Sequence, residues 1–168
     1  MDIPVQHEGE YVLTSSGSRD FGEITPEIAR IIKREHGKIR LEKGFQKDGH
    51  GFGEIHIERP DRLKQLKSNG FSNARDFIEF VAKDYDAIYQ GKDNNILVVT
   101  TNKNANIAFL SIKLNENDKD AYWTVESAFI ARKDYLNDKP ILWQKNNAAF
   151  GNQDGTIKSR KGRSPIIN

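Results

Sequence analysis

The spacing of hydrophobic residues changes near residue 95, and this change constrains the fold more than any other feature of the sequence. Residues 96–101 (ILVVTT) form a continuous apolar run, whereas residues 106–114 and 122–130 alternate between apolar and polar side chains. Short polar turns separate these runs, and residues 140–145 (PILWQK) suit a final edge strand. The pattern predicts a four-stranded antiparallel sheet built as a meander.

Helical signals come before these strands. Thr25 can cap a helix whose first position is a proline, and Gly37 can end that helix in the left-handed conformation. A second helix is expected over residues 61–68, and a third from its cap Ser72 to Gly91. The apolar residues of the third recur at helical spacing: Phe77, Ile78, Val81, Tyr85 and Ile88. Together the elements predict an α+β domain in which N-terminal helices pack on the sheet.

Composition divides the chain into three parts. Residues 1–18 are polar and turn-rich and are expected to form a flexible arm, residues 19–147 form the domain, and residues 148–168 form a basic tail expected to be disordered. The net charge is +2, and the tail has four basic residues against one acidic residue. The rest of the chain is therefore close to neutral. This composition does not indicate a globally basic nucleic-acid binder, so an anionic ligand would need a local cluster of cations or the tail.

Several classes of protein are excluded. The chain has no cysteine, which rules out disulfides, thiolate zinc sites and a cysteine nucleophile. No apolar run approaches the roughly 18 residues that a membrane helix needs. The first residues, MDIPVQHEGEY, lack the basic start and apolar stretch of a signal peptide. No membrane segment and no resident cofactor are expected.

The histidines are the main candidates for proton transfer, because the pKa of histidine lies near neutrality. His36 is placed to interact with the end of a helix dipole, and His50 lies in a glycine-rich loop. His56 lies between two isoleucines, so a half-buried structural role and a catalytic role are both open. The spacing of His50 and His56 matches no common metal-ligand motif, and no metal site is expected.

Hydroxyl and basic groups supply further candidates. Thr124 and Ser127 are an odd number of residues apart in one predicted strand, which places them on opposite faces of the sheet. Basic residues near the histidines, and a cluster after that strand, could hold a phosphate or form a solvated face. The candidates for contact with an anion are Arg40, Lys43, Arg59, Arg62, Arg132, Lys133 and Tyr135.

Five segments, in this order, resemble one known family. They are DFGEITPEIA (20–29), GKIRLEKG (37–44), GFGEIHIERPDR (51–62), FIEFVAKDYDAIY (77–89) and WTVESAF (123–129), the last followed by Arg132, Lys133 and Tyr135. The sequence resembles the phage- and bacteria-associated endoribonuclease toxin domains of the Barnase–EndoU–colicin–RelE-like group. The resemblance covers most of the chain and implies a barnase/RelE-like fold, with helices packed on a four-stranded antiparallel sheet.

The resemblance implies metal-independent cleavage of RNA. The 2′-hydroxyl attacks the adjacent phosphorus, which leaves a 2′,3′-cyclic phosphate and a free 5′-hydroxyl. The reaction needs a base, an acid and donors for the charged phosphorane. The expected partners are RNA, with tRNA as the leading candidate, and a cognate immunity protein or antitoxin. The expected place of action is the bacterial cytoplasm, with delivery as the C-terminal part of a larger or phage-encoded protein.

Individual roles follow from the matching positions. His56 matches the histidine of the family's His-Ile motif, Arg59 matches a basic residue after it, and Ser127 matches a hydroxyl in the late strand motif. Lys133 is a weaker catalytic match, and His50 is kept as a second acid or base. The remaining matches are expected to contact RNA: Arg40, Lys43, Arg62, Thr124, Arg132 and Tyr135.

One departure keeps other functions open. Relatives place a second histidine soon after the His-Ile motif, whereas this chain has Arg-Pro-Asp-Arg at residues 59–62. The second proton carrier would then be His36, His50 or Glu58, or the chain would be a non-catalytic RNA- or protein-binding module of phage origin. A third reading is a transferase that uses a nucleotide such as NAD, with Tyr122, Glu126 and Ser127 in its site.

Overall fold

The computed structural model describes residues 10–101, 106–116 and 121–145. In these residues the helices are α1 (Pro26–Ile32), α2 (Gly53–Ile57), α3 (Pro60–Ser68) and α4 (Ala74–Lys83), with a 3-10 helix η2 (Lys133–Leu136). The strands are β1 (Tyr11–Val12), β2 (Gly22–Ile24), β3 (Gly37–Glu42), β4 (Phe45–Lys47), β5 (His50–Phe52), β6 (Ala87–Gln90), β7 (Ile96–Thr101), β8 (Asn106–Asn115), β9 (Tyr122–Arg132) and β10 (Ile141–Gln144). None of these helices is long and apolar enough to cross a membrane.

The chain folds as an α+β domain, as predicted, but the sheet is larger than four strands. Its order is β1-β3-β9-β8-β7-β6-β10, and β2 pairs with the first half of β3. The predicted meander is confirmed as β7, β8 and β9, which pair antiparallel in sequence. The pairing of β3 with β9 is parallel, and β4 and β5 form a separate hairpin. The helices do not precede all the strands, because they alternate with β2 to β5.

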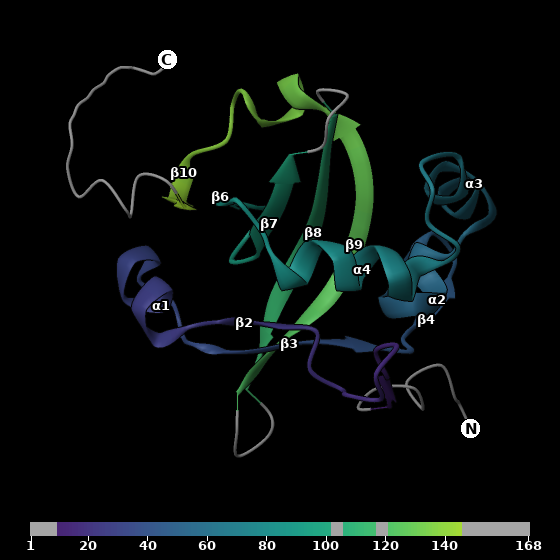
Figure 1. Cartoon of the computed structure of the whole chain (residues 1–168), viewed down its shortest axis with the longest axis horizontal. Helices are drawn as coiled ribbons and strands as arrows, with labels where there is room; N and C mark the ends of the chain where they lie inside the picture. Colours follow the sequence, from purple (N-terminus) through teal and green to yellow (C-terminus); the bar gives the residue numbers. More distant parts are fainter. Residues whose placement is uncertain (1–9, 102–105, 117–120, 146–168) are drawn as a thin grey trace.

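The main core lies between the helices and one face of the sheet. Helix α4 packs against β7 and β8, while α2 and α3 lie beside β9 (Figure 1). The largest fully buried side chains include Phe77 of α4, Ile57 of α2 and Trp123 of β9. Burial of such apolar surface stabilises the fold by about 25 cal/mol per Å². This packing fixes α2 and α3 along the edge of β9.

The first helix begins as predicted and ends earlier. The Thr25 hydroxyl accepts a hydrogen bond from the Ile28 amide at 3.2 Å. The left-handed cap is Lys33, with a φ of 60°, and not Gly37. Gly37 begins β3, where a Cβ would lie 2.9 Å from the Ala121 carbonyl oxygen. The glycine therefore permits the close approach of two strands, which the local sequence could not indicate.

The predicted third helix is wrong over its second half. Helix α4 begins after Asn73, whose side chain accepts from the Asp76 amide at 2.8 Å, and it ends at Lys83. Ile88 continues the helical spacing in sequence but lies in β6, opposite Val98 of β7. Pairing with a neighbouring strand overrides the local periodicity here.

Part of the predicted arm is held against the domain. Tyr11 pairs with Glu42 in β3, and Thr14 is buried. The Ser15 amide and hydroxyl donate to the two carboxylate oxygens of Glu79, at 3.0 and 2.8 Å. Residues 10–18 are therefore packed on the edge of the sheet and on α4. Residues 1–9 and the predicted tail, 148–168, lie outside the described residues.

A β-bulge in β9 changes which side chains share a face. Val125 pairs with Ile112, but Ser127 pairs with Ser111, so Glu126 is the extra residue. Before the bulge, Trp123 and Val125 point into the main core; after it, Ala128 and Ile130 do. Ser127 therefore lies on the face opposite the core, together with Thr124. The prediction that these two hydroxyl residues lie on opposite faces is wrong, because a bulge reverses the alternation.

Candidate functional site

The candidate site lies where α2, the start of α3 and the second half of β9 meet. Arg59 caps α3, and Pro60 occupies its first turn, where a missing amide hydrogen costs little. The Gln65 side chain donates to the Ile130 carbonyl at 3.0 Å and accepts from the Ile130 amide at 3.3 Å. These two hydrogen bonds fasten α3 to the edge of β9 that β3 leaves unpaired.

His56 is held from both sides. Its Nδ1 lies 2.5 Å from Gln46 Oε1, and an amide oxygen can only accept, so Nδ1 carries the proton. Arg59 Nη1 lies 2.7 Å from His56 Nδ1 and 2.8 Å from Nε2, and it also donates to the His56 carbonyl at 2.9 Å. Arg59 therefore contacts both ring nitrogens, and the tautomer is assigned from the Gln46 contact alone. With the proton on Nδ1, Nε2 is the basic nitrogen of a neutral imidazole.

The electrostatic surroundings keep this imidazole neutral. Burial lowers the pKa of His56, and the nearby Arg59 and Arg62 guanidinium groups lower it further. Gln46 is brought to the ring by the β4–β5 hairpin, in which Gly51 lies beside it. A Cβ on Gly51 would lie 2.6 Å from Gln46 Oε1 and 3.0 Å from His56 Nδ1. The glycine thus leaves room for the Gln46–His56 contact.

Arg62 extends the cationic cluster toward β9. Its guanidinium carbon lies 4.0 Å from the centre of the Phe129 ring, and its Nε is buried without a hydrogen-bond partner among the described residues. Burial lowers the pKa of Arg62, and the adjacent Arg59 lowers it further. Phe129 also contacts the Tyr135 ring, with the ring centres 5.9 Å apart. Arg59 and Arg62 therefore place two cations next to a neutral histidine and an aromatic pair.

Ser127 belongs to the same half of β9. Because of the bulge, it shares a sheet face with Phe129, two residues further along the strand. Ser127 is half-buried and pairs with Ser111 of β8. The structure thus brings His56, Arg59, Arg62 and Tyr135 together and puts Ser127 on the face that the Phe129 ring occupies.

The candidates for a second proton carrier lie in different places. His50 is exposed at the tip of the β4–β5 hairpin, and β5 lies against β9. His36 is exposed in the turn before β3. Glu58 accepts a hydrogen bond from the Ala74 amide at 2.8 Å, so its carboxylate holds the start of α4.

Two predicted RNA contacts are buried. Arg40 is 6% exposed and pairs with Asp20, with its Nε 2.9 Å from the carboxylate. Thr124 is also buried, and its hydroxyl has no hydrogen-bond partner among the described residues. Their position in the packed sheet does not suit contact with RNA. The alternating pattern misses the burial of Arg40, because the groups that enclose it, Asp20 and the rings of Tyr11 and Tyr122, are distant in sequence.

The other predicted contacts lie at the surface. Arg132 is exposed and lies 3.6 Å from Asp134, while Tyr135 is 38% exposed. Lys43 lines a separate pocket with Glu54, on the side of α2 opposite His56. The Lys133 side chain lies outside the described residues.

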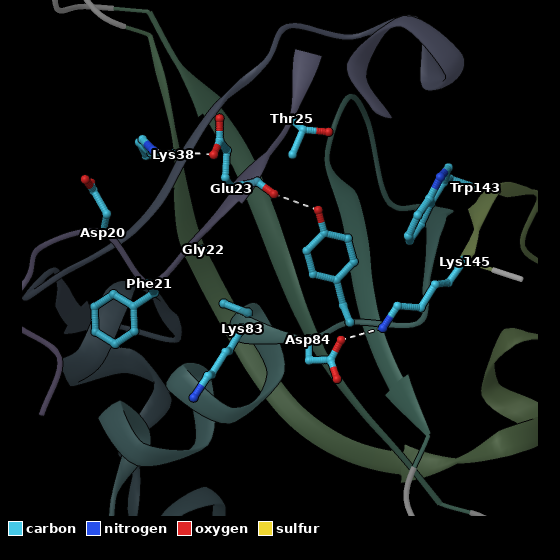
Figure 2. A pocket seen from close by; sticks show the side chains of 12 residues that line it. Asp20, Phe21, Gly22, Glu23, Thr25, Lys38, Lys83, Asp84, Trp143 and Lys145 are labelled. Carbon is cyan, nitrogen blue, oxygen red and sulfur yellow. Dashed lines mark hydrogen bonds and ion pairs between the residues drawn. The ribbon is translucent and has the colours of Figure 1, made fainter. Parts of the chain in front are cut away.

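A second pocket, of about 460 Å³, lies between β2, the end of α4 and β10 (Figure 2). Four of its charged groups form two pairs: Lys38 Nζ lies 3.4 Å from Glu23, and Lys145 lies against Asp84. The Tyr85 hydroxyl donates to the Glu23 carbonyl at 2.6 Å, and burial raises the pKa of this phenol. These contacts join β2, β3 and the ends of α4 and β10, and none of the described residues that line the pocket is a histidine.

Sequence reasoning missed three residues of the site. Gln46 orients His56, Phe129 receives Arg62, and Gln65 fastens α3 to β9. Gln46 and Gln65 carry no pattern that singles them out, since each acts through a partner distant in sequence. Uninterrupted alternation along residues 122–130 would put Phe129 on the same face as Trp123 and Val125, whereas the bulge at Glu126 puts it on the face where it meets Arg62.

Comparisons with protein-family models, with curated proteins and with solved structures found no match for this chain. Any function must therefore be argued from the chemistry of the site.

Proposed function

We propose that this chain is a metal-independent endoribonuclease that cleaves RNA by attack of the 2′-hydroxyl on the adjacent phosphorus. The observation that carries the proposal is His56, a neutral imidazole between Gln46 and Arg59 with Arg62 beside it. A neutral imidazole is a base near neutral pH, and two guanidinium groups are donors for a phosphorane. The barnase/RelE-like arrangement is part of this proposal, with β7 to β9 as the shared strands.

The reaction can be written with these residues. The phosphate draws Arg59 from His56 Nε2 to its own oxygens, because a charge-assisted contact is stronger than one with a neutral ring. The freed Nε2 takes the proton of the 2′-hydroxyl while the O2′–P bond forms. The P–O5′ bond then breaks, and the 5′-oxygen gains a proton from water or from His50. Arg62 and the Ser127 hydroxyl hold the phosphate oxygens during the transfer.

The test is incubation of the purified protein with total bacterial RNA and with tRNA, with and without EDTA, followed by mapping of the new ends. We expect EDTA-resistant cuts with cyclic-phosphate ends. His56→Ala should lower the rate by about 100-fold or more, since proton transfer contributes about 10²- to 10⁴-fold. His36→Ala is the matched control, because its neighbour Gly37 lies against Ala121 and Tyr122 at the start of β9, whereas the site lies at the second half of that strand. Equal rates in wild type and His56→Ala would refute the assignment.

A non-catalytic module that binds RNA or a protein is the second candidate. The specific observation for it is that Arg59 engages the basic nitrogen of His56 in this structure. Binding without new RNA ends would favour this reading. Cytoplasmic action, delivery by a phage-encoded protein and an immunity partner belong to the nuclease proposal. Toxicity on expression in bacteria, relieved in His56→Ala, would support them.

A further inference from the structure

A row of alternating cations and aromatic rings leads away from His56. Arg62 lies over Phe129 at 4.0 Å, Phe129 contacts Tyr135 at 5.9 Å, and Lys139 Nζ lies 4.2 Å from the centre of the Tyr135 ring. These four residues, here called the cation–aromatic row, come from α3, β9, η2 and the loop before β10. The row starts beside Arg59, whose charge acts on Arg62.

Packing alone does not account for the row. Arg62 is kept partly desolvated next to another guanidinium, and its buried Nε has no hydrogen-bond partner among the described residues. A buried donor without a partner is unfavourable, and a bound anion supplies acceptors for such a guanidinium. At the other end, Tyr135 is 38% exposed, and the ion pair of Lys139 is with its sequence neighbour Asp138 at 3.4 Å. The Lys139 ammonium thus lies on the exposed Tyr135 ring, and its ion-pair partner Asp138 has a side chain that is 86% exposed.

We propose that the cation–aromatic row binds an unpaired nucleotide next to the scissile phosphate. Its base stacks on Tyr135, in place of the Lys139 ammonium, and its phosphates are held by Arg62 and Lys139. The inference rests on the proposed nuclease function, because the position of the bound nucleotide relative to the cleaved bond follows from Arg62, which lies near His56 and Arg59. Alternating cations and aromatic rings match the alternating phosphates and bases of a single strand.

This subsite selects single-stranded RNA. Bases in a duplex are stacked and paired within the helix, so they cannot reach an aromatic side chain. A loop, a bulge or a free end can splay its base onto Tyr135. The substrate class is therefore RNA with an unpaired nucleotide beside the cleaved bond, and continuous duplex RNA should bind poorly.

The test measures binding without cleavage. Wild-type protein is titrated into fluorescent 2′-O-methyl RNA, which lacks the attacking hydroxyl, as a single strand, as a duplex and as a single strand with one abasic position. We expect the single strand to bind at least 5-fold more tightly than the duplex. Tyr135→Leu should weaken binding of the intact strand by about 5-fold or more, because a stacked base contributes about 1–3 kcal/mol. The same substitution should not change binding of the abasic strand.

Two further variants keep the test independent of misfolding. Tyr135→Phe retains the ring and should bind like wild type, whereas Phe80→Leu removes a ring on α4 that is 47% exposed, against 38% for Tyr135, and should have no effect. Tyr135→Leu affinity within twofold of wild type, or duplex binding as tight as single-strand binding, would overturn the subsite. Ring-dependent binding in a protein that cuts no RNA would leave the subsite standing and refute the nuclease. Cleavage that does not depend on Tyr135 would refute the subsite and leave the nuclease proposal standing.

Discussion

Replacing Arg40 with alanine should destabilise the fold strongly and should not impair RNA binding directly. The guanidinium is held by Asp20 at 2.9 Å and lies between two rings, 5.4 Å from the centre of Tyr11 and 4.9 Å from that of Tyr122. A hydrogen bond between charged groups contributes about 1.5–3 kcal/mol, and each cation–π contact about 0.5–2 kcal/mol. Asp20 is about one-third exposed, so the unpaired carboxylate would be partly hydrated. We therefore expect a loss of about 3 kcal/mol.

Lys38→Ala provides the matched control, since Lys38 lies on the same strand and also pairs with a carboxylate. Its contact with Glu23 is 3.4 Å long, and the two side chains are 48% and 38% exposed. Exposed pairs contribute about 0–1 kcal/mol. With a urea m-value of about 1–3 kcal/mol/M, the midpoint should fall by at least about 1 M for Arg40→Ala and much less for Lys38→Ala. Equal midpoints, or weaker RNA binding by a fully stable Arg40→Ala protein, would refute the structural role.

Three further predictions concern the site and its supports. Arg59→Gln should raise the pKa of His56, because the substitution removes a nearby positive charge while the burial of the ring remains. The NMR titration of the ring and the acid limb of the pH–rate profile should both move to higher pH. An unchanged titration would contradict this prediction. Gln65→Ala should lower the free energy of unfolding by about 1–2 kcal/mol through two lost hydrogen bonds, and a loss no larger than in Lys64→Ala would count against it. Burial raises the pKa of Glu54, so ionisation of this carboxyl group opposes folding above the ordinary carboxyl pKa. Glu54→Gln should therefore stabilise the protein by about a few tenths of a kcal/mol at pH 7 and not at pH 3. The absence of a gain in melting temperature at pH 7 would refute this prediction.

The features that sequence predicts well are those set by neighbours along the chain. Thr25 caps a helix because its hydroxyl reaches an amide three residues later. The strands β7 to β9 are visible because burial follows an alternating pattern with short polar turns. Ile88 shows the limit of local patterns, since its spacing fits a helix while its partner in β7 is ten residues away. Where pairing with a neighbouring strand determines the secondary structure of a residue, local spacing does not predict it.

The bulge at Glu126 is the most consequential feature without a local signal. It depends on how β9 pairs with β8, and the residues of β9 read as uninterrupted alternation. Its effect is to turn Phe129 away from the main core and toward Arg62. Without the bulge, Phe129 would pack inside and the guanidinium would lose its aromatic contact. The sequence indicates His56 as a candidate residue, but it does not indicate the surface that Phe129 forms near it.

Net charge was a poor guide to an anion site for a related reason. Acidic side chains in this domain have structural roles: Asp20 holds Arg40, Glu58 holds the start of α4, and Glu79 holds the segment at Ser15. Asp20 and Glu79 lower the overall charge from elements other than α2 and α3, whereas Glu58 and Asp61 are sequence neighbours of Arg59 and Arg62, and the charge of Asp61 raises the pKa of Arg62. The field at a bound phosphate depends on charges within about 10 Å at physiological salt, so distant carboxylates have little effect there. A nearly neutral domain can therefore present a strongly cationic site.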